Sequence, residues 1–217
     1  MLAGHYAPAF LAKAASPRTP LWMLLLAAQF VDVLWVTAVL TGIEHARLDP
    51  SLPSNPLDLY HMPWTHSLLA SLGWSIVAFF AATRVFGLAT MQAALVAAVV
   101  TSHWFLDLLV HRPDLTLAGG SSKLGMGIWN YPAPAWALEV ALVVAGVAVA
   151  MRACAHSDVS RRAWLWLGGG LLVLQTSASF GPIPPSLTAI ALSTVAIYFM
   201  VIAAGAKVDA AARGSGS

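Results

Sequence analysis

The sequence predicts an all-α membrane protein: a bundle of six transmembrane helices, preceded by a short N-terminal helix that is re-entrant or spans half of the bilayer. The composition is the first reason, because 59% of the 217 residues are hydrophobic and only 9% are charged, against about 25% charged residues in soluble proteins. Six apolar runs are long enough to cross a hydrocarbon core of roughly 30 Å. Proline and glycine clusters separate them. We therefore expect residues 1–213 to form one membrane-embedded domain and residues 214–217 to form a tail or linker.

The predicted spans follow one another with few polar residues between them. They cover approximately residues 21–41, 64–84, 88–110, 134–153, 163–180 and 186–205. Residues 1–15 are apolar but too short to cross a bilayer, and the sequence Ser16-Pro17-Arg18-Thr19-Pro20 that follows is typical of a turn. The N-terminal helix and the first span are therefore expected to form a hairpin.

Basic residues are distributed unequally between the two sides of this arrangement. With the first turn placed in the cytoplasm, eight of the eleven Lys and Arg residues lie inside: Lys13, Arg18, Arg84, Arg152, Arg161, Arg162, Lys207 and Arg213. The positive-inside rule favours this orientation, with the N-terminal region and the C-terminus on the cytoplasmic side of the inner membrane. Two loops of some twenty residues, at 42–63 and 111–133, then lie on the outer face. Long loops on one face are typical of a site that opens there.

Histidines and aspartates within the apolar segments are the main functional signal. His5 and Asp32 lie thirteen and fourteen residues from the middle of the first turn, and His66 and His103 lie nineteen and eighteen residues from the next cytoplasmic turn. At 1.5 Å per residue, the two pairs differ in depth by only about 8 Å. We therefore expect four helices to bring these side chains into one layer in the outer half of the bilayer.

A bound divalent cation explains why such residues are placed there. An ionisable side chain at bilayer depth costs roughly 2.5–3.5 kcal/mol, and a cation compensates the carboxylates. His103 and Asp107 are one helical turn apart and can face the same cavity. The predicted metal ligands are His5, Asp32, His66, His103 and Asp107. Zinc is the preferred ion, with one or two bound, while manganese, iron or nickel also suit these ligands.

Three further residues are candidates for acid–base catalysis. His61 and His111 lie at the expected outer mouth of the site, where each could be a second-metal ligand, a proton donor or a solvated loop histidine. Glu139 is one turn into the fourth span and could be a general base, a further ligand or an interfacial carboxylate. Glu44 and His45 follow the first span directly, and we expect them to form an exposed loop pair. Residues 1–132 would thus form the metal-site half and residues 133–206 the supporting helices.

These motifs resemble a bacterial family of integral-membrane metal-dependent hydrolases. The resemblance covers roughly residues 1–132 and rests on Gly4-His5, the Tyr60–Ser67 segment with its Thr-His-Ser element, Ser102-His103 with Leu106-Asp107, and His111–Asp114. The ligand order is also similar to that of the zinc-dependent bacterial phospholipase C group. This resemblance implies hydrolase activity and the same five metal ligands, but the chain lacks that group's N-terminal tryptophan ligand and a clear later His-x-x-x-Glu element.

The sequence therefore favours a membrane-embedded metal-dependent hydrolase that cleaves a lipid or lipid-linked substrate, with a phosphoester preferred over a carboxylic ester or amide. The alternative is a metal-ion or proton transporter that uses the same cluster, because intramembrane His and Asp often mark ion pathways. A structural metal, or a subunit of a larger assembly, is a third reading. Nucleic acid is not an expected partner, since the net charge is only +2 and the basic residues are scattered.

Overall fold

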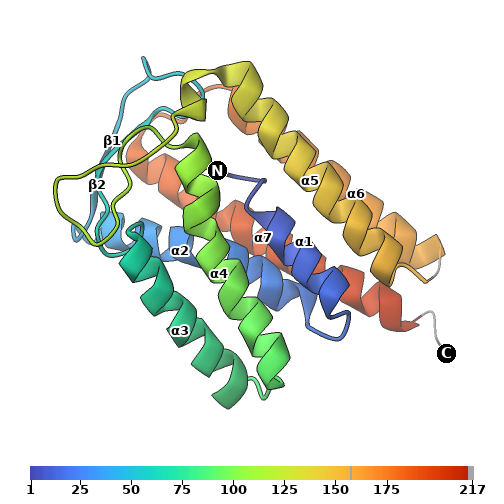
Figure 1. The fold of residues 1–217 in the computed structure, drawn as a ribbon. Helices are drawn as coiled ribbons and strands as arrows, with labels where there is room; N and C mark the ends of the chain where they lie inside the picture. Colours follow the sequence, from blue (N-terminus) through green and yellow to red (C-terminus); the bar gives the residue numbers. More distant parts are fainter. Residues whose placement is uncertain (157, 215–217) are drawn as a thin grey trace.

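A computed structural model describes residues 1–156 and 158–214. This part of the chain contains seven α-helices, one short 3₁₀ helix and a two-stranded sheet. Their bounds are α1 Tyr6–Ala15, α2 Leu21–Leu40, β1 His45–Leu48, β2 Leu57–His61, α3 Leu68–Arg84, α4 Thr90–Val110, η1 Ile128–Asn130, α5 Pro132–Cys154, α6 Asp158–Phe180 and α7 Leu187–Gly214. The protein is thus almost entirely helical, as the sequence predicts (Figure 1).

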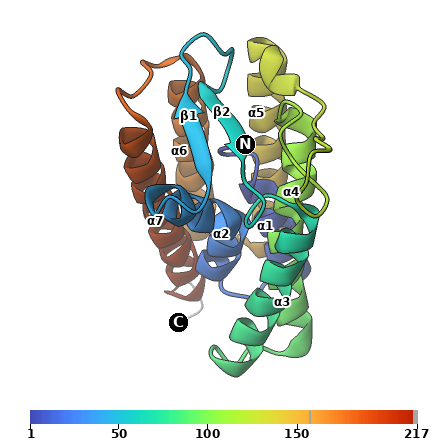
Figure 2. The same cartoon turned by 90° about the vertical axis from the view of Figure 1, so that its left-hand side faces the viewer.

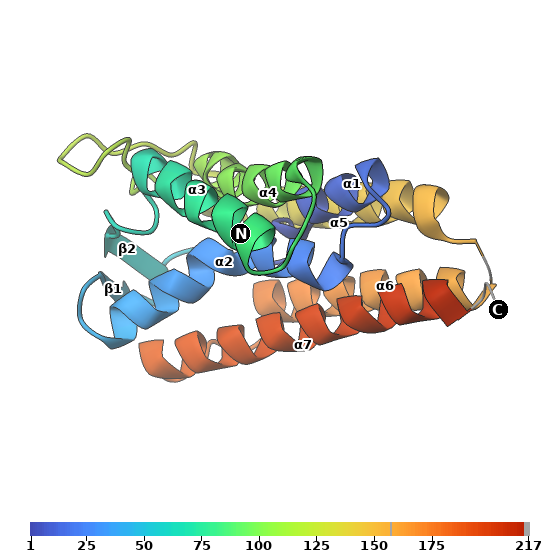
Figure 3. The ribbon, with the colours of Figure 1, turned by 90° about the horizontal axis from the view of Figure 1, so that it is seen from below.

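The helices are arranged around α2, which lies in the middle of the bundle. On one side are the α3–α4 hairpin, α1 and α5; on the other are α6 and α7 (Figure 3). The long connections, including the sheet and residues 111–131, gather at one end, whereas the α1–α2 turn and the end of α7 lie towards the other. Figure 2 shows β1 and β2 at the end of the bundle where the N-terminus lies.

Four helices are long and apolar enough to cross a membrane: α2, α4, α5 and α7. The other two predicted spans correspond to α3 and α6, and six spans are therefore not confirmed. Helix α3 has 17 residues, which is about 25 Å at 1.5 Å per residue, because the chain from Trp64 to Ser67 is not helical. Helix α6 begins at Asp158 and includes Arg161 and Arg162 in its first turns. Four apolar helices nevertheless indicate a membrane protein.

The loop between α2 and α3 contains the antiparallel pair β1–β2, which the sequence did not predict. His45 lies opposite His61, and a register shift separates that pair from the next one, Arg47 and Asp58. The pair is short, and two of the five β2 side chains, Leu57 and Leu59, point into the protein. The sheet thereby covers the end of the bundle with an apolar face.

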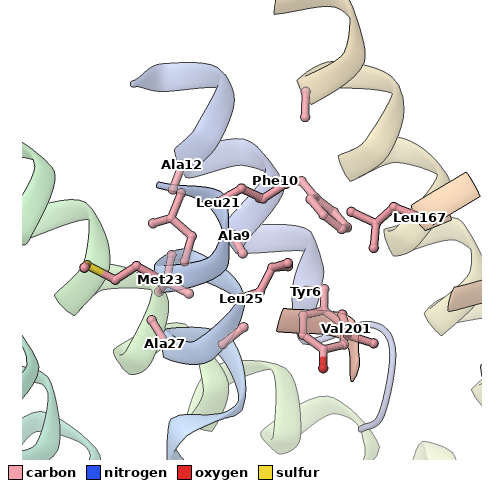
Figure 4. Packing of buried hydrophobic residues seen from close by; sticks show 14 of the residues in the cluster. Tyr6, Ala9, Phe10, Ala12, Leu21, Met23, Leu25, Ala27, Leu167 and Val201 are labelled. Atoms are coloured by element: carbon pink, nitrogen blue, oxygen red, sulfur yellow. The ribbon is translucent and has the colours of Figure 1, made fainter. Parts of the chain in front are cut away.

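The main core is formed by buried side chains of α1, α2, α4, α5, α6 and α7. Phe10 of α1 and Leu167 of α6 are buried side by side, with Leu25 of α2 nearby (Figure 4). Helix α1 can approach α5 closely because Gly146 has no side chain. A Cβ at that position would lie 3.1 Å from both the Ala7 Cα and the Phe10 ring. This close approach determines the position of the chain segment that begins α1 and carries His5.

A buried ion pair joins the α1–α2 turn to α7. Lys13 donates to the Asp209 carboxylate at 2.7 Å and to the Pro17 and Thr19 carbonyls at 2.8 Å. The second Asp209 oxygen accepts the Leu21 backbone N–H at 2.7 Å. All three ammonium protons and both carboxylate oxygens thus have partners, which is the condition under which a charged pair can be buried at moderate cost.

Candidate metal centre

The structure brings the five predicted ligands together. The start of α1 contributes His5, α2 contributes Asp32, the turn before α3 contributes His66, and α4 contributes His103 and Asp107. Two groups of side chains each place their nitrogen and oxygen atoms within 4.8 Å of one another: His5, His103 and Asp107, and Asp32, His66 and His103. The similar lengths of the two arms on either side of each turn therefore predicted a convergence that is present in the fold.

Asp107 is the centre of this cluster. One of its oxygens lies 3.1 Å from His5 Nε2 and 3.2 Å from His111 Nε2, and the other lies 3.1 Å from His103 Nε2. Its side chain is only 1% exposed. Asp32 is on the opposite side, with one oxygen 3.4 Å from His66 Nε2 and 3.5 Å from His103 Nε2.

Each of three histidines is held by an oxygen acceptor on its outward nitrogen. The Nδ1 of His103 lies 2.9 Å from the Ala28 carbonyl, which can only accept, so this nitrogen carries the proton. The Nδ1 of His111 lies 2.8 Å from an Asp114 carboxylate oxygen. In both rings the Nε2 atom is therefore left with its lone pair directed into the cluster, which is how carboxylate and carbonyl partners orient metal-binding histidines.

His66 is oriented through Thr65 by Glu44, a residue that the sequence analysis misplaced. Glu44 is fully buried and accepts the Thr65 hydroxyl at 2.6 Å, the Thr65 N–H at 2.9 Å and the Trp64 N–H at 2.7 Å. Since the single Thr65 hydroxyl proton goes to Glu44, the Thr65 oxygen accepts from His66 Nδ1–H at 2.8 Å. The expectation of an exposed Glu44–His45 pair is thus wrong for Glu44, while His45 is exposed.

Several buried atoms in the cluster lack a hydrogen-bond partner within the described residues. These atoms are both ring nitrogens of His5, the Nε2 of His103 and one oxygen of Asp107. The Nε2 atoms of His5 and His103 each lie about 3.1 Å from an Asp107 oxygen. The orientation of these groups nevertheless does not form a hydrogen bond. Buried polar atoms without partners are costly, and donor atoms that converge on a shared point suit a cation. The nitrogen and carboxylate donors fit zinc or a related divalent ion.

The three candidate catalytic residues are placed differently from one another. His111 lies at the end of α4 beside Asp107, and the Trp129 ring covers it with a centroid distance of 4.2 Å. Glu139 is buried on α5 and accepts the backbone N–H groups of Leu2 and Gly4 at 2.8 and 3.2 Å. His61 is exposed at the end of β2, where its ring stacks on His45. The structure thus joins His111 to the cluster and leaves His61 outside it.

The supporting helices also contribute to the site. Tyr198 of α7 donates a 2.6 Å hydrogen bond to Asp32, and Gln175 of α6 accepts the Ala3 N–H at 3.2 Å. The Met1 amino group lies 2.8 Å from Asp107. Neither Tyr198 nor Gln175 belongs to a motif that marks it as a site residue. Their only signal was that polar side chains recur within otherwise apolar helices.

A cavity of about 560 Å³ opens beside the cluster. Asp32, His66, His111 and Glu139 line it, together with side chains from α2, α6, α7 and the loop at 52–57. This volume is typical of a small-molecule site. Among the described residues that line it, none is Lys or Arg. Arg112 follows the lining residue His111, and partial burial lowers the pKa of its guanidinium below the usual value.

The arrangement is therefore a group of buried His and Asp side chains that could hold a metal ion beside a cavity. Searches of protein-family models, characterised proteins and solved structures find no match for this chain.

Proposed function

We propose that this protein is a membrane-embedded metal-dependent hydrolase that cleaves a phosphoester, or else a carboxylic ester, of a lipid or lipid-linked substrate. The observation that carries the proposal is the set of inward-facing Nε2 atoms around Asp107 and Asp32, directly beside the cavity. His5, Asp32, His66, His103 and Asp107 would hold the ion or ions. The resemblance to the integral-membrane hydrolase family points to the same residues and to the same class of reaction.

The charge of the cavity supports a role for the cation in the reaction. A phosphoester needs positive charge close to its oxygens, and none of the described residues that line the cavity is Lys or Arg. A divalent cation bound here would polarise an ester or phosphoryl oxygen and make a water nucleophilic near neutral pH.

The protein side chains would position the reacting groups. Oxygen atoms of Ala28, Thr65 and Asp114 contact the Nδ1 atoms of three imidazoles, those of His103, His66 and His111 respectively. These contacts favour the tautomer in which the Nε2 lone pair points into the cluster. His111 lines the cavity and lies between Asp107 and Asp114, so it is placed either as a further ligand or to donate a proton to the leaving group. Glu139 also lines the cavity, but two backbone N–H groups occupy one of its oxygens, which favours a role in holding the start of the chain.

We also propose that the site opens towards the outer face of the inner membrane, with the α1–α2 turn in the cytoplasm. The loops that cover the cavity then lie outside, and most Lys and Arg residues lie inside.

Metal analysis with a matched pair of variants tests the proposal. Purified protein is expected to retain a stoichiometric divalent metal, the His66→Gln/His103→Gln variant to lose it, and the exposed-histidine control His61→Gln to keep it. The metal-loaded protein in detergent should cleave at least one member of a panel of phospholipids and lipid-linked phosphates, and chelation should abolish this cleavage. Equal, negligible metal in all three proteins would overturn the metal site. Metal-loaded protein that cleaves nothing but carries metal into liposomes would replace the hydrolase with a transporter.

A further inference from the structure

The cavity extends well beyond the metal cluster, and the remote part has a different lining. Near the cluster the walls carry Asp32 and His66. Away from it, the walls are formed by α6 and α7 beneath Leu57 of β2, where the aliphatic Leu174, Ile190 and Ile197 stand among small hydroxyl residues such as Ser193 and Thr194. The cavity therefore has a polar end, where the proposed reaction occurs, and an end between α6 and α7 whose lining residues carry no charge, called the apolar end below.

The outer loops cover the cavity on the side of the sheet. Arg112 binds two loops together, donating to the Pro53 carbonyl at 2.6 Å and to the Asn130 side chain at 3.0 Å. Leu57 is buried beneath the first of these loops. Arg112 thus acts as a clamp between these loops.

The edge between α6 and α7 is different, because its rim is apolar and exposed. Phe180 at the end of α6 and Ile183 in the α6–α7 connection line the cavity, yet they are 62% and 45% exposed. Exposed apolar side chains at the rim of a cavity are typical of an opening towards an apolar phase or ligand.

We propose that the apolar end of the cavity binds an aliphatic chain of the substrate, which enters from the bilayer between the end of α6 and the start of α7. The polar group of the same amphiphile then reaches Asp32, His66 and His111. This inference rests on the proposed function, because it assigns the substrate of that site to the long-chain amphiphiles. It distinguishes them from water-soluble phosphoesters, for which the apolar end has no use.

Photo-crosslinking measures chain binding without requiring activity. The probe is a monoacylglycerol with a diazirine near the end of its chain, added to the protein in lipid nanodiscs. We expect crosslinks in peptides from residues 174–197. The Ile190→Trp variant fills the apolar end, and displacing about two methylenes should reduce this crosslinking about tenfold. Leu192→Trp is the matched control, because Leu192 lies two residues further along α7 and is 58% exposed.

A second measurement separates this inference from the proposed function. Metal content reports whether Ile190→Trp is folded, and it should equal that of the unsubstituted protein. Hexadecyl and butyl 4-nitrophenyl phosphates then report hydrolysis, and Ile190→Trp should slow only the hexadecyl diester. Crosslinks spread over the lipid-facing helices and insensitive to Ile190→Trp would overturn the chain pocket, even in an active enzyme. Crosslinking that Ile190→Trp abolishes, in a protein that hydrolyses neither ester, would overturn the hydrolase and leave the chain pocket standing.

Discussion

The bundle buries two charged clusters, and they differ in how completely their atoms are paired. At the end with the α1–α2 turn, Lys13 and Asp209 use every proton and both carboxylate oxygens within the protein. At the other end of α1, His5 and Asp107 are equally buried but keep atoms without a hydrogen-bond partner in the described residues. A closed cluster stabilises the fold, whereas an open one of this kind is suited to binding something that the protein does not itself supply.

The largest expected effect concerns the closed cluster. Lys13→Met removes the cation and leaves Asp209 buried without it, which should cost about 3–5 kcal/mol of stability. Unfolding in mixed detergent micelles measures this loss. The double variant Lys13→Met/Asp209→Leu should recover most of it, because no charge is then left unpaired. Folded protein of either variant should still bind metal. A loss of metal from folded Lys13→Met would show that the two clusters are not independent.

The open cluster should respond in metal affinity. Asp107→Asn removes the carboxylate that lies closest to three histidines, and metal affinity should fall by about 100-fold. Competition with a chromogenic chelator measures the affinity. Asp58→Asn is the matched control, since Asp58 pairs with the exposed Arg47 on the sheet. Equal affinities in the two variants would argue against metal binding at Asp107.

The next effect tests whether Glu44 determines the tautomer of His66. In Glu44→Gln, the new amide can donate to Thr65, whose hydroxyl must then donate to His66 Nδ1. The His66 proton would move to Nε2, the atom that faces Asp32 and Asp107. We expect metal affinity to fall about 10–100-fold and the ¹⁵N shifts of His66 to exchange between its two ring nitrogens. Thr65→Ser keeps the hydroxyl and should preserve both properties. An unchanged tautomer in Glu44→Gln would remove Glu44 from the site.

A smaller effect is expected for Tyr198, the only residue of α7 that bonds to a predicted ligand in the described structure. Tyr198→Phe removes one hydrogen bond to a charged Asp32 oxygen, and such bonds contribute about 1.5–3 kcal/mol. A cation bound to Asp32 would compensate part of this lost free energy. We therefore expect a loss near the lower limit, which corresponds to about tenfold in metal affinity. Isothermal titration with zinc measures it, beside the exposed-tyrosine control Tyr60→Phe. An affinity equal to that control would contradict the role assigned to Tyr198.

The smallest effect is expected at His61, which the sequence proposed as a catalytic candidate and the structure places on the exposed edge of β2. His61→Ala should change stability by no more than about 0.5 kcal/mol and should leave metal content and chelator competition unchanged. A decrease in hydrolysis at constant metal content would instead support the proton-donor role that the sequence allowed.

Local patterns predicted much of this protein. Apolar runs located the seven helices, although α3 begins at Leu68 rather than at Trp64. There the Trp64 and Thr65 N–H groups bind Glu44, and the Leu68 and Leu69 N–H groups bind the carbonyls of Thr116 and Leu117. Hydropathy does not detect such competition for backbone groups. The sheet was missed for a related reason, since β1 is half polar and is defined by its pairing with β2.

The sequence by itself determined the helical class, the apolar character of the helices and the meeting of the five histidine and aspartate side chains, because helix periodicity and arm length are local properties. Only the tertiary structure decided which atoms of these ligands face one another. The acceptors that orient the histidines come from Ala28, Glu44 through Thr65, and Asp114, and Tyr198 comes from a helix far away in the chain. A hydrogen bond depends on the position of both partners. For partners as distant as Asp32 and Tyr198, that position is set by helix packing rather than by any sequence spacing.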